Sequence, residues 1–174
     1  EGGADAYLEK PFHKEELLLR IKKLLELRSN LQQFYIKHAG LTVTNAAVHF
    51  TDAVGLLPDL NQAEDSFVKK VREVVEVHMA DVDFTVERMC KYMFMSHSQL
   101  HRKLDALTGC PPNKFIRMVR LNKAKEQLKN HAVTIASIAL DCGYNDPGYF
   151  ARVFKQECGV TPQEWRVRGE YNRQ

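Results

Sequence analysis

The sequence lacks a long apolar run, a paired-cysteine motif and a basic-then-apolar leader at its start. No apolar run approaches the roughly 18 residues that a membrane-spanning helix needs, and the start of the chain does not resemble a signal peptide. The four cysteines show no C-x-x-C spacing, so we interpret them as reduced, mostly buried thiols of a cytoplasmic protein. Because the chain begins Glu1-Gly2-Gly3 without a methionine, we expect it to be a piece of a longer protein.

The net positive charge is small, but the basic excess is concentrated in one stretch. The 174 residues are 44% hydrophobic and 27% charged, with a net charge of +3, which suits one ordinary domain, with or without an arm. Residues 86–130 contain 10 Lys and Arg against 3 Asp and Glu, or +7, whereas residues 64–85 contain 3 against 6, or −3. Such a basic stretch indicates either a polyanionic partner or only a solvated face.

Helical periodicity covers the chain except for one segment. An apolar stripe with helical spacing runs through 15–33, and another helix is predicted over 65–79. Between them, Gly, Pro, Thr and Asn break the period, so we interpret 38–63 as a linker with room for a short strand. Strand signals after residue 64 are nearly absent, which predicts an all-α C-terminal part.

Residues 85–165 contain an internal repeat. Thr85 recurs as Thr134 after 49 positions, and Gly109 recurs as Gly159 after 50. Residues of the same chemical type recur in the same order between these points, which indicates one supersecondary unit used twice.

The first copy, over 85–108, is predicted to be a helix, a tight turn and a second helix. Thr85 and Ser96 suit the N-caps of the two helices, and Gly109 suits the position just after the second. Leucines at helical spacing face inward on the second helix. They leave an outer polar face made of His97, Ser98, His101, Arg102 and Asp105.

The second copy, over 134–158, repeats this plan with different residues. Thr134 suits the first N-cap, and Gly143 lies at the turn, where a positive φ costs glycine little. Asp146 then suits the N-cap of a helix whose first residue is Pro147, a favoured position for proline.

A basic helix over 112–129 is expected to join the two copies. Two helices joined by a short turn form a helix-turn-helix, whose second helix fits the major groove of DNA. A rigid connector would let one chain read two half-sites about one DNA turn, ~34 Å, apart. Basic side chains and helix N-termini are expected to contact phosphates, with candidates at Thr85, Lys103, Arg120, Lys123, Thr134 and Lys155.

Two motifs carry a specific resemblance to a known family. The first motif is Ser96-His97-Ser98-Gln99-Leu100-His101-Arg102-Lys103-Leu104, followed by Thr108-Gly109-Cys110-Pro111-Pro112. The second motif includes three segments, Cys142-Gly143-Tyr144, Tyr149-Phe150-Ala151-Arg152-Val153-Phe154-Lys155 and Gly159-Val160-Thr161-Pro162. With them, residues 65–168 resemble the DNA-binding domain of the AraC family of transcription regulators. The resemblance implies an all-α domain over 64–174, with seven helices in two helix-turn-helix subdomains joined by a long helix. It also implies base-facing positions at His97, Ser98, His101, Arg102, Gly148, Tyr149 and Arg152.

The sequence departs from that family's pattern in two places. Phe94 occupies the first turn, where the family often has glycine, so we expect this turn to adopt a conformation that a bulky residue accepts. Pro147 and Gly148 stand where many members have polar base readers. The second helix-turn-helix is therefore expected to contribute phosphate contacts and shape reading more than hydrogen bonds to base edges.

Residues 1–37 resemble the end of a different domain. Gly3-Ala4-Asp5-Ala6-Tyr7-Leu8-Glu9-Lys10-Pro11-Phe12 and the helix after it are similar to the last strand and final helix of a response-regulator receiver domain. The resemblance implies that Lys10 contacts a phosphorylated carboxylate and that Tyr7 changes rotamer on activation. The acceptor Asp would lie upstream, so this piece is not phosphorylated by that chemistry. The order of domains resembles hybrid two-component regulators, whose full-length chains add a kinase and in some cases a membrane anchor.

Other functions remain as alternatives to DNA binding. The main one is a protein-interaction module that dimerises through the 15–33 helix. An enzyme is the weakest option, since no nucleophile–base pair, carboxylate pair or phosphate-binding glycine loop is evident.

His97 and His101 are spaced like two metal ligands but have no evident third ligand, so no metal or other cofactor is expected. The expected partners are double-stranded DNA, RNA polymerase and a second copy of the chain, with no small-molecule substrate.

Overall fold

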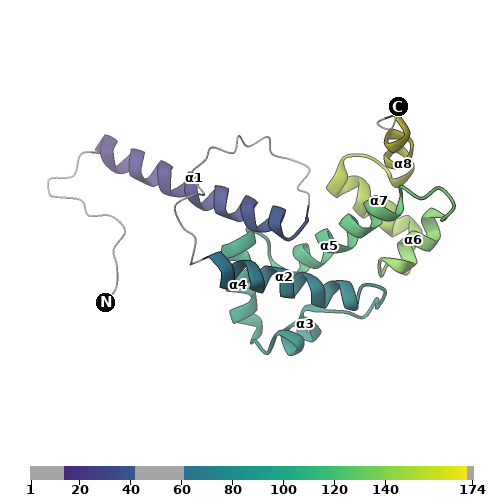
Figure 1. Cartoon of the computed structure of the whole chain (residues 1–174), viewed down its shortest axis with the longest axis horizontal. Coiled ribbons are helices and arrows are strands. Elements are labelled where there is room, and N and C mark those ends of the chain that lie inside the picture. The colour runs from purple at the N-terminus through teal and green to yellow at the C-terminus, as the bar shows by residue number, and fades with distance from the viewer. Residues whose placement is uncertain (1–13, 42–60, 172–174) are drawn as a thin grey trace.

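The computed structural model describes residues 14–41 and 61–171, and in these ranges the chain forms eight α-helices and no strand (Figure 1). The helices are α1 (Lys14–His38), α2 (Asn61–Val77), α3 (Val86–Met93), α4 (His97–Thr108), α5 (Pro112–Gln127), α6 (Ile135–Asp141), α7 (Pro147–Cys158) and α8 (Pro162–Tyr171). The predicted all-α class is therefore confirmed. Tyr7, Lys10 and the strands expected near residue 10 and in the linker lie outside the described residues.

The helices form two groups joined by α5. Helices α2, α3 and α4 pack together, and the last turns of α1 lie against α2 and α4. Helix α5 packs on α2 and α4 at one side and on α6 at the other, where α6, α7 and α8 form the second group (Figure 1). Helices α2 to α8 are thus the seven helices that the family resemblance implies, and α5 is the connector.

One apolar core runs through both groups. In α4, Leu100 and Leu104 are fully buried, and in α7 Phe150 and Phe154 take the corresponding inward positions. Phe115 of α5 is buried in the same cluster. Because the inward residues of each second helix are fixed by this burial, its other side faces out and is available for a ligand.

The caps predicted for the first unit are present at α4. Ser96 and Gln99 form a capping box. The main-chain amide of Gln99 donates to Ser96 Oγ at 3.3 Å, and the main-chain amide of Ser96 donates to Gln99 Oε1 at 3.0 Å. Gly109 ends α4 with a φ of 66°. Thr85 lies at the N-cap position of α3 but accepts no capping hydrogen bond. The start of α4 is therefore held firmly, which matters because that end carries the candidate base readers.

The conformation of Phe94 contradicts the expectation for the first turn. Its φ is 53°, in the left-handed region, and it is the one residue other than glycine with a positive φ among the described residues. The turn thus keeps the backbone shape that glycine usually provides. Its side chain is 92% exposed, so no packing compensates for the strain.

The second unit is capped as predicted. Thr134 Oγ1 accepts from the Ser137 amide at 3.1 Å, and Asp146 Oδ1 accepts from the Gly148 amide at 2.7 Å. Gly143 has a φ of 76°, and a Cβ atom there would lie 2.3 Å from the Met79 carbonyl oxygen. This glycine therefore permits both the turn and the close approach of the second group to the loop before α3.

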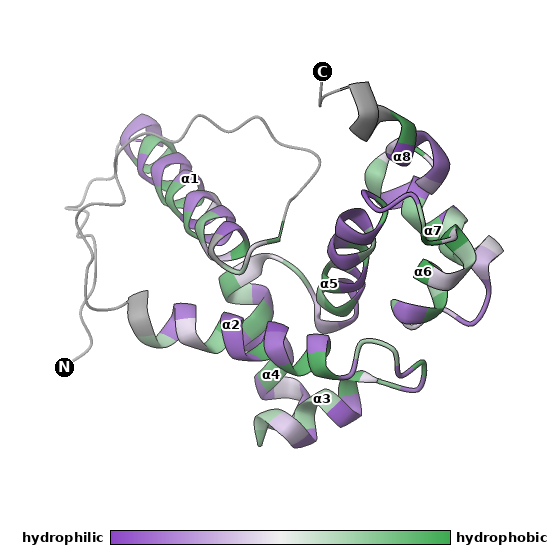
Figure 2. Cartoon of the chain, turned by 45° about the vertical axis from the view of Figure 1, so that its right-hand side comes forward, coloured by the Kyte–Doolittle hydropathy of each residue, from purple (hydrophilic) through white to green (hydrophobic). Residues whose placement is uncertain are grey.

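Helix α1 has two different halves. From Lys14 to Ser29 it is exposed on nearly all sides, including its leucines, and Figure 2 shows green and purple residues mixed along it. Farther along, the chain enters the core, where Tyr35, Ile36, Ala39 and Leu41 are buried. The helix is thus longer than the predicted 15–33, and the segment interpreted as a linker overlaps the end of α1, the buried residues after it and the start of α2.

The four cysteines are free thiols, and three are buried, namely Cys90, Cys110 and Cys142. Cys158 is partly buried. Burial raises the pKa of each thiol, that of Cys142 to about 12. The interpretation of these residues as mostly buried thiols agrees with their positions.

Candidate nucleic-acid interface

The outer face of α4 brings together the four base-facing candidates of the first unit. His97, Ser98, His101 and Arg102 are all exposed, and the two imidazole rings stack with centroids 6.4 Å apart. Among the described residues, no group of three His, Cys, Asp or Glu is placed to hold a metal ion. The face presents hydrogen-bond donors and acceptors and a guanidinium, which are the groups that recognise base edges.

Lys103 follows these residues on α4 but points elsewhere. Its Nζ lies 4.3 Å from the ring centroid of Phe67 on α2, a cation–π contact. The side chain is exposed, so its charge lies at the edge of the α4 face rather than among the base-facing candidates.

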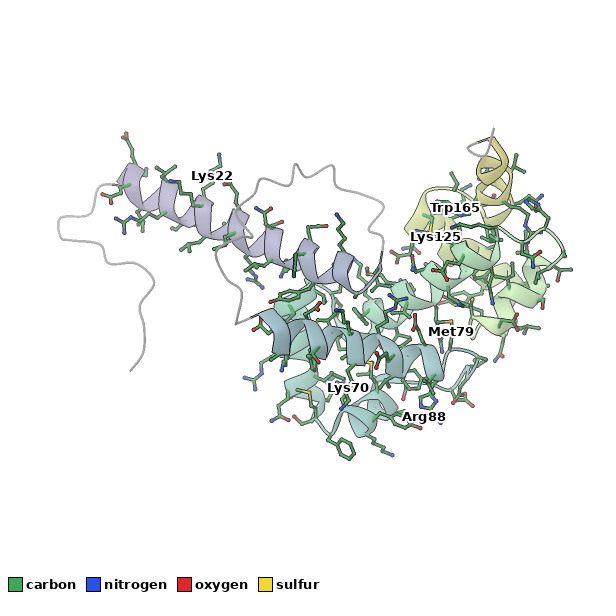
Figure 3. All side chains as sticks on the ribbon, viewed as in Figure 1. Lys22, Lys70, Met79, Arg88, Lys125 and Trp165 are labelled. Carbon is green, nitrogen blue, oxygen red and sulfur yellow. The ribbon has the colours of Figure 1, made fainter. Side chains whose placement is uncertain are left out.

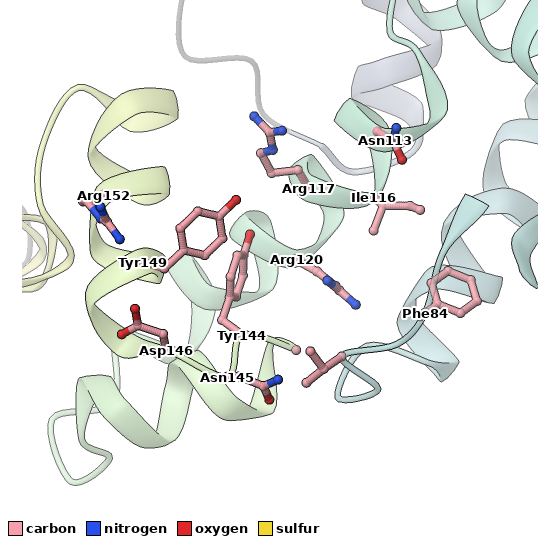
Figure 4. A pocket seen from close by; sticks show the side chains of 12 residues that line it. Phe84, Asn113, Ile116, Arg117, Arg120, Tyr144, Asn145, Asp146, Tyr149 and Arg152 are labelled. Carbon is pink, nitrogen blue, oxygen red and sulfur yellow. The ribbon is translucent and has the colours of Figure 1, made fainter. Parts of the chain in front are cut away.

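The candidates on α7 also lie together. Gly148, Tyr149 and Arg152 are exposed, and the Arg152 guanidinium lies 5.9 Å from the Tyr149 ring centroid (Figure 4). Asp146 is occupied as the cap of this helix. Lys155 is exposed one turn farther along. The α7 face thus offers an aromatic ring and a cation, with few groups suited to base-specific hydrogen bonds.

The basic residues of α5 differ in how far their side chains are exposed to solvent. Lys123 is exposed and pairs with Glu126 at 3.6 Å. Arg120 Nη2 donates to the Asp81 carbonyl at 2.8 Å, and burial lowers the pKa of this guanidinium from its usual value. Lys125 is only 8% exposed and lies 5.0 Å from the ring centroid of Trp165 on α8 (Figure 3). Lys125 therefore contributes to packing of the second group and is not available to a polyanion.

Sequence reasoning did not find the cleft between the two groups. It has a volume of about 650 Å³, and α5, α7, the α6–α7 turn and the loop before α3 line it (Figure 4). Asn113, Arg117 and Asn145 line the same cleft as Tyr149 and Arg152 but were not singled out as site candidates. The helical spacing of 113, 117 and 120 was a usable signal, but which face of α5 would remain open depends on the packing of α6 and α7.

Comparisons with known proteins agree with this geometry. A family model described as a helix-turn-helix domain matches residues 89–168. The protein named histidine kinase P4 of Formosa agariphila is 30% identical over 97% of this chain, and the transcriptional activator RhaR of Salmonella arizonae is 34% identical over 48%. The C-terminal domain of the response regulator AraT of Geobacillus stearothermophilus superimposes with a TM-score of 0.53 at 27% identity, covering 57% of this chain and 83% of that one.

This chain carries an AraC-type DNA-binding domain. The region matches part of a transcriptional activator in sequence and the C-terminal domain of a response regulator in structure. The aligned regions span 11% of the length of the histidine kinase and 29% of that of RhaR. Within the described residues, no helix is long and apolar enough to cross a membrane.

Proposed function

We propose that the AraC-type domain reads one major groove with α4 and the next with α7. His97, Ser98, His101 and Arg102 would contact base edges, and Gly148, Tyr149 and Arg152 would contribute more to shape reading. The observation that carries the proposal is the outward polar face of a capped α4, repeated by α7 on the other side of α5. Thr85, Lys103, Arg120, Lys123, Thr134 and Lys155 are the proposed phosphate contacts.

Selection of bound sites from random duplexes tests this arrangement. Two conserved half-sites with centres about one DNA turn apart are expected, the one read by α4 being the better defined. Salt titration accompanies the selection, since log K should fall linearly with log[salt], with a slope of about −0.9 per phosphate contact. A single short site would contradict reading by both units, and no duplex binding at low salt would contradict DNA binding itself.

The parent protein is proposed to be a cytoplasmic or membrane-anchored hybrid two-component regulator. The similarity to a histidine kinase over 97% of this chain supports it, as does the likeness to a response-regulator C-terminal domain. In this proposal residues 1–37 are the C-terminal end of a receiver domain, and residues 38–63 are the linker between it and the output domain. Residues 64–174 form that output domain, which acts with RNA polymerase. Transcription in vitro from a template carrying the selected site, with and without the phosphorylated parent, tests the signalling role.

A second copy of the chain is the proposed partner of the exposed half of α1. Seven large apolar side chains are exposed there, and a continuous apolar patch rarely stays bare. They are Leu17, Leu18, Leu19, Ile21, Leu24, Leu25 and Leu27. Sedimentation should show a dimer for the chain and a monomer for a variant with Leu18→Glu and Leu25→Glu. Equal masses for the two proteins would contradict dimerisation through this helix.

A further inference from the structure

One face of α5 forms the floor of the cleft between the two helix groups. Asn113, Ile116, Arg117 and Arg120 recur at helical spacing on this face, and all four line the cleft. Asn113 is exposed and the two arginines are partly exposed, whereas Ile116 is buried, so only part of this face is open to solvent. Helix α5 otherwise packs against helices of both groups. Figure 4 shows the side chains of α5 across the cleft from those of α7.

The cleft is cationic. Three guanidiniums line it, those of Arg117, Arg120 and Arg152, and the one acidic lining residue is Asp146. An oxygen of that carboxylate already accepts the hydrogen bond that caps α7. The cleft thus has an excess of cations, and its lining also includes apolar residues such as Phe84. Such a surface suits the phosphates and sugars of a nucleic-acid strand.

The two arginines of α5 are held in place but retain donors. Arg120 is fixed by its bond to the Asp81 carbonyl, and its buried Nε has no hydrogen-bond partner among the described residues. Arg117 Nη1 contacts Glu157 Oε1 of α7 at 2.9 Å. A guanidinium has five N–H donors, so neither contact exhausts its capacity. Partial burial strengthens the attraction of these charges for an anion, because less water screens them.

We propose that this cleft binds the DNA backbone between the two half-sites, with Arg117 and Arg120 donating to its phosphates and Asn113 supporting them. The inference rests on the proposed reading of two adjacent major grooves by α4 and α7. Tyr149 and Arg152 connect the two ideas, because they are base-facing candidates and also line the cleft. DNA that reaches these two residues passes directly beside the arginines of α5.

Arginine–phosphate contacts in the cleft should raise the affinity for DNA without adding sequence specificity. An arginine fork binds a phosphate through two parallel hydrogen bonds, which lysine does not reproduce. Phosphates are the same at every base pair, so the cleft would add affinity without adding direct sequence discrimination. It would also fix the spacing of the half-sites, because the backbone between them must lie along α5.

The test measures binding of the full chain to the selected duplex and to random duplex over a range of salt concentrations. Arg117→Gln should weaken both complexes by the same factor, roughly tenfold, and should reduce the salt slope by about 1. Lys22→Gln, which makes the same charge change on the exposed part of α1, is the matched control and should leave both quantities unchanged. Figure 3 shows that Lys22 lies far from α5.

Glu157→Gln separates a phosphate contact from a structural ion pair. It removes the partner of Arg117 but leaves the guanidinium, so binding should be unchanged or tighter. The inference is overturned if Glu157→Gln weakens binding as much as Arg117→Gln does, or if Arg117→Gln binds with the wild-type affinity and salt slope. Absence of specific binding by the wild-type chain would instead overturn the proposed reading by α4 and α7, and this inference with it.

Discussion

The side-chain amide of Gln32 donates a hydrogen bond to the main-chain carbonyl of Ala106 at 3.2 Å, which joins α1 to the end of α4. The same nitrogen lies 3.4 Å from the Asp105 carbonyl. Both carbonyls belong to the last turn of α4, where carbonyls lack the usual i+4 amide partners of a helix interior. The Asp105 carbonyl also accepts from the main-chain amide of Gly109 at 2.8 Å. Farther along, Asn122 of α5 donates to the Gly40 carbonyl at 3.0 Å. The end of α1 therefore packs against the AraC-type domain and contacts the helix proposed to read DNA.

The buried end of α1 should contribute to the stability of the domain. Ile36→Ala is expected to lower the free energy of unfolding by about 2–5 kcal/mol, because the truncation leaves a cavity in the core. Lys23→Ala on the same helix should change it by less than about 0.5 kcal/mol, since Lys23 is exposed and is not among the apolar residues of the proposed dimer surface. Urea denaturation of the three proteins provides the comparison. Equal small effects would show that the end of α1 does not stabilise the domain.

Phe94→Gly should stabilise the protein. A left-handed conformation costs a residue with a Cβ atom about 1–2 kcal/mol, whereas the greater freedom of glycine in the unfolded chain costs about 0.4–1 kcal/mol. The expected net gain in the free energy of unfolding is about 0.5–1 kcal/mol, measurable as a higher urea midpoint. Phe94→Ala keeps the Cβ atom and should show no comparable gain. A destabilised glycine variant would mean that the Phe94 ring makes a contact that its exposure does not suggest.

Arg102→Ala and Lys123→Ala should affect DNA binding differently. The first is expected to reduce discrimination at one base step by about 1–3 kcal/mol, because a guanidinium can bind two acceptors of a guanine. The second should weaken binding to all sequences alike and lower the salt slope by about 1. Competition between the selected duplex and single-base variants measures the difference. If both mutants lose the same factor on specific and random DNA, Arg102 is not a base reader.

The free energy of unfolding should decrease at alkaline pH, in part because of Cys142. Burial raises the pKa of this thiol from 9.0 to about 12, so above pH 9 the unfolded chain releases a proton that the folded chain keeps. The stabilising contribution is therefore complete below pH 9 and is lost as the pH rises towards 12. At pH 10 the loss amounts to roughly 1 kcal/mol. Burial also raises the pKa of Tyr144 to about 12, which adds to the fall in the same direction.

Cys142→Ala isolates this part of the pH dependence. The variant should be less stable at pH 7, because it loses buried volume, but its stability should change less between pH 7 and pH 10. Urea midpoints at the two pH values measure both quantities. An identical change in the two proteins would indicate that the folded state ionises Cys142 as readily as the unfolded chain does.

Local chemistry made much of the fold predictable. Ser96, Gly109, Thr134 and Asp146 cap helices in the structure as the sequence indicated, because a cap depends on a few neighbouring residues. The repeat and the spacing of apolar residues likewise predicted the two second helices and their inward sides. The exposed face of α4 followed directly from that pattern.

The errors occurred where a distant contact decides the outcome. Lys125 belongs to the basic helix predicted over 112–129, but it is buried and its charge lies near Trp165 of α8. Phe94 was expected to avoid a conformation that the geometry of the turn in fact imposes on it. The buried Lys125 lies near a residue 40 positions away, whereas Phe94 connects α3 and α4, which pack against each other. In both cases the arrangement of whole helices overrides the preference of a single residue.

The sequence by itself determined the helices, their caps and the two polar faces proposed to read DNA, since these depend on residues within one or two turns of each other. Only the tertiary structure decided that the end of α1 belongs to the core and contacts α4. It also decided that part of one face of α5 stays open between the two helix groups. Both features arise from the packing of segments tens of residues apart, where burial of apolar surface outweighs local preference.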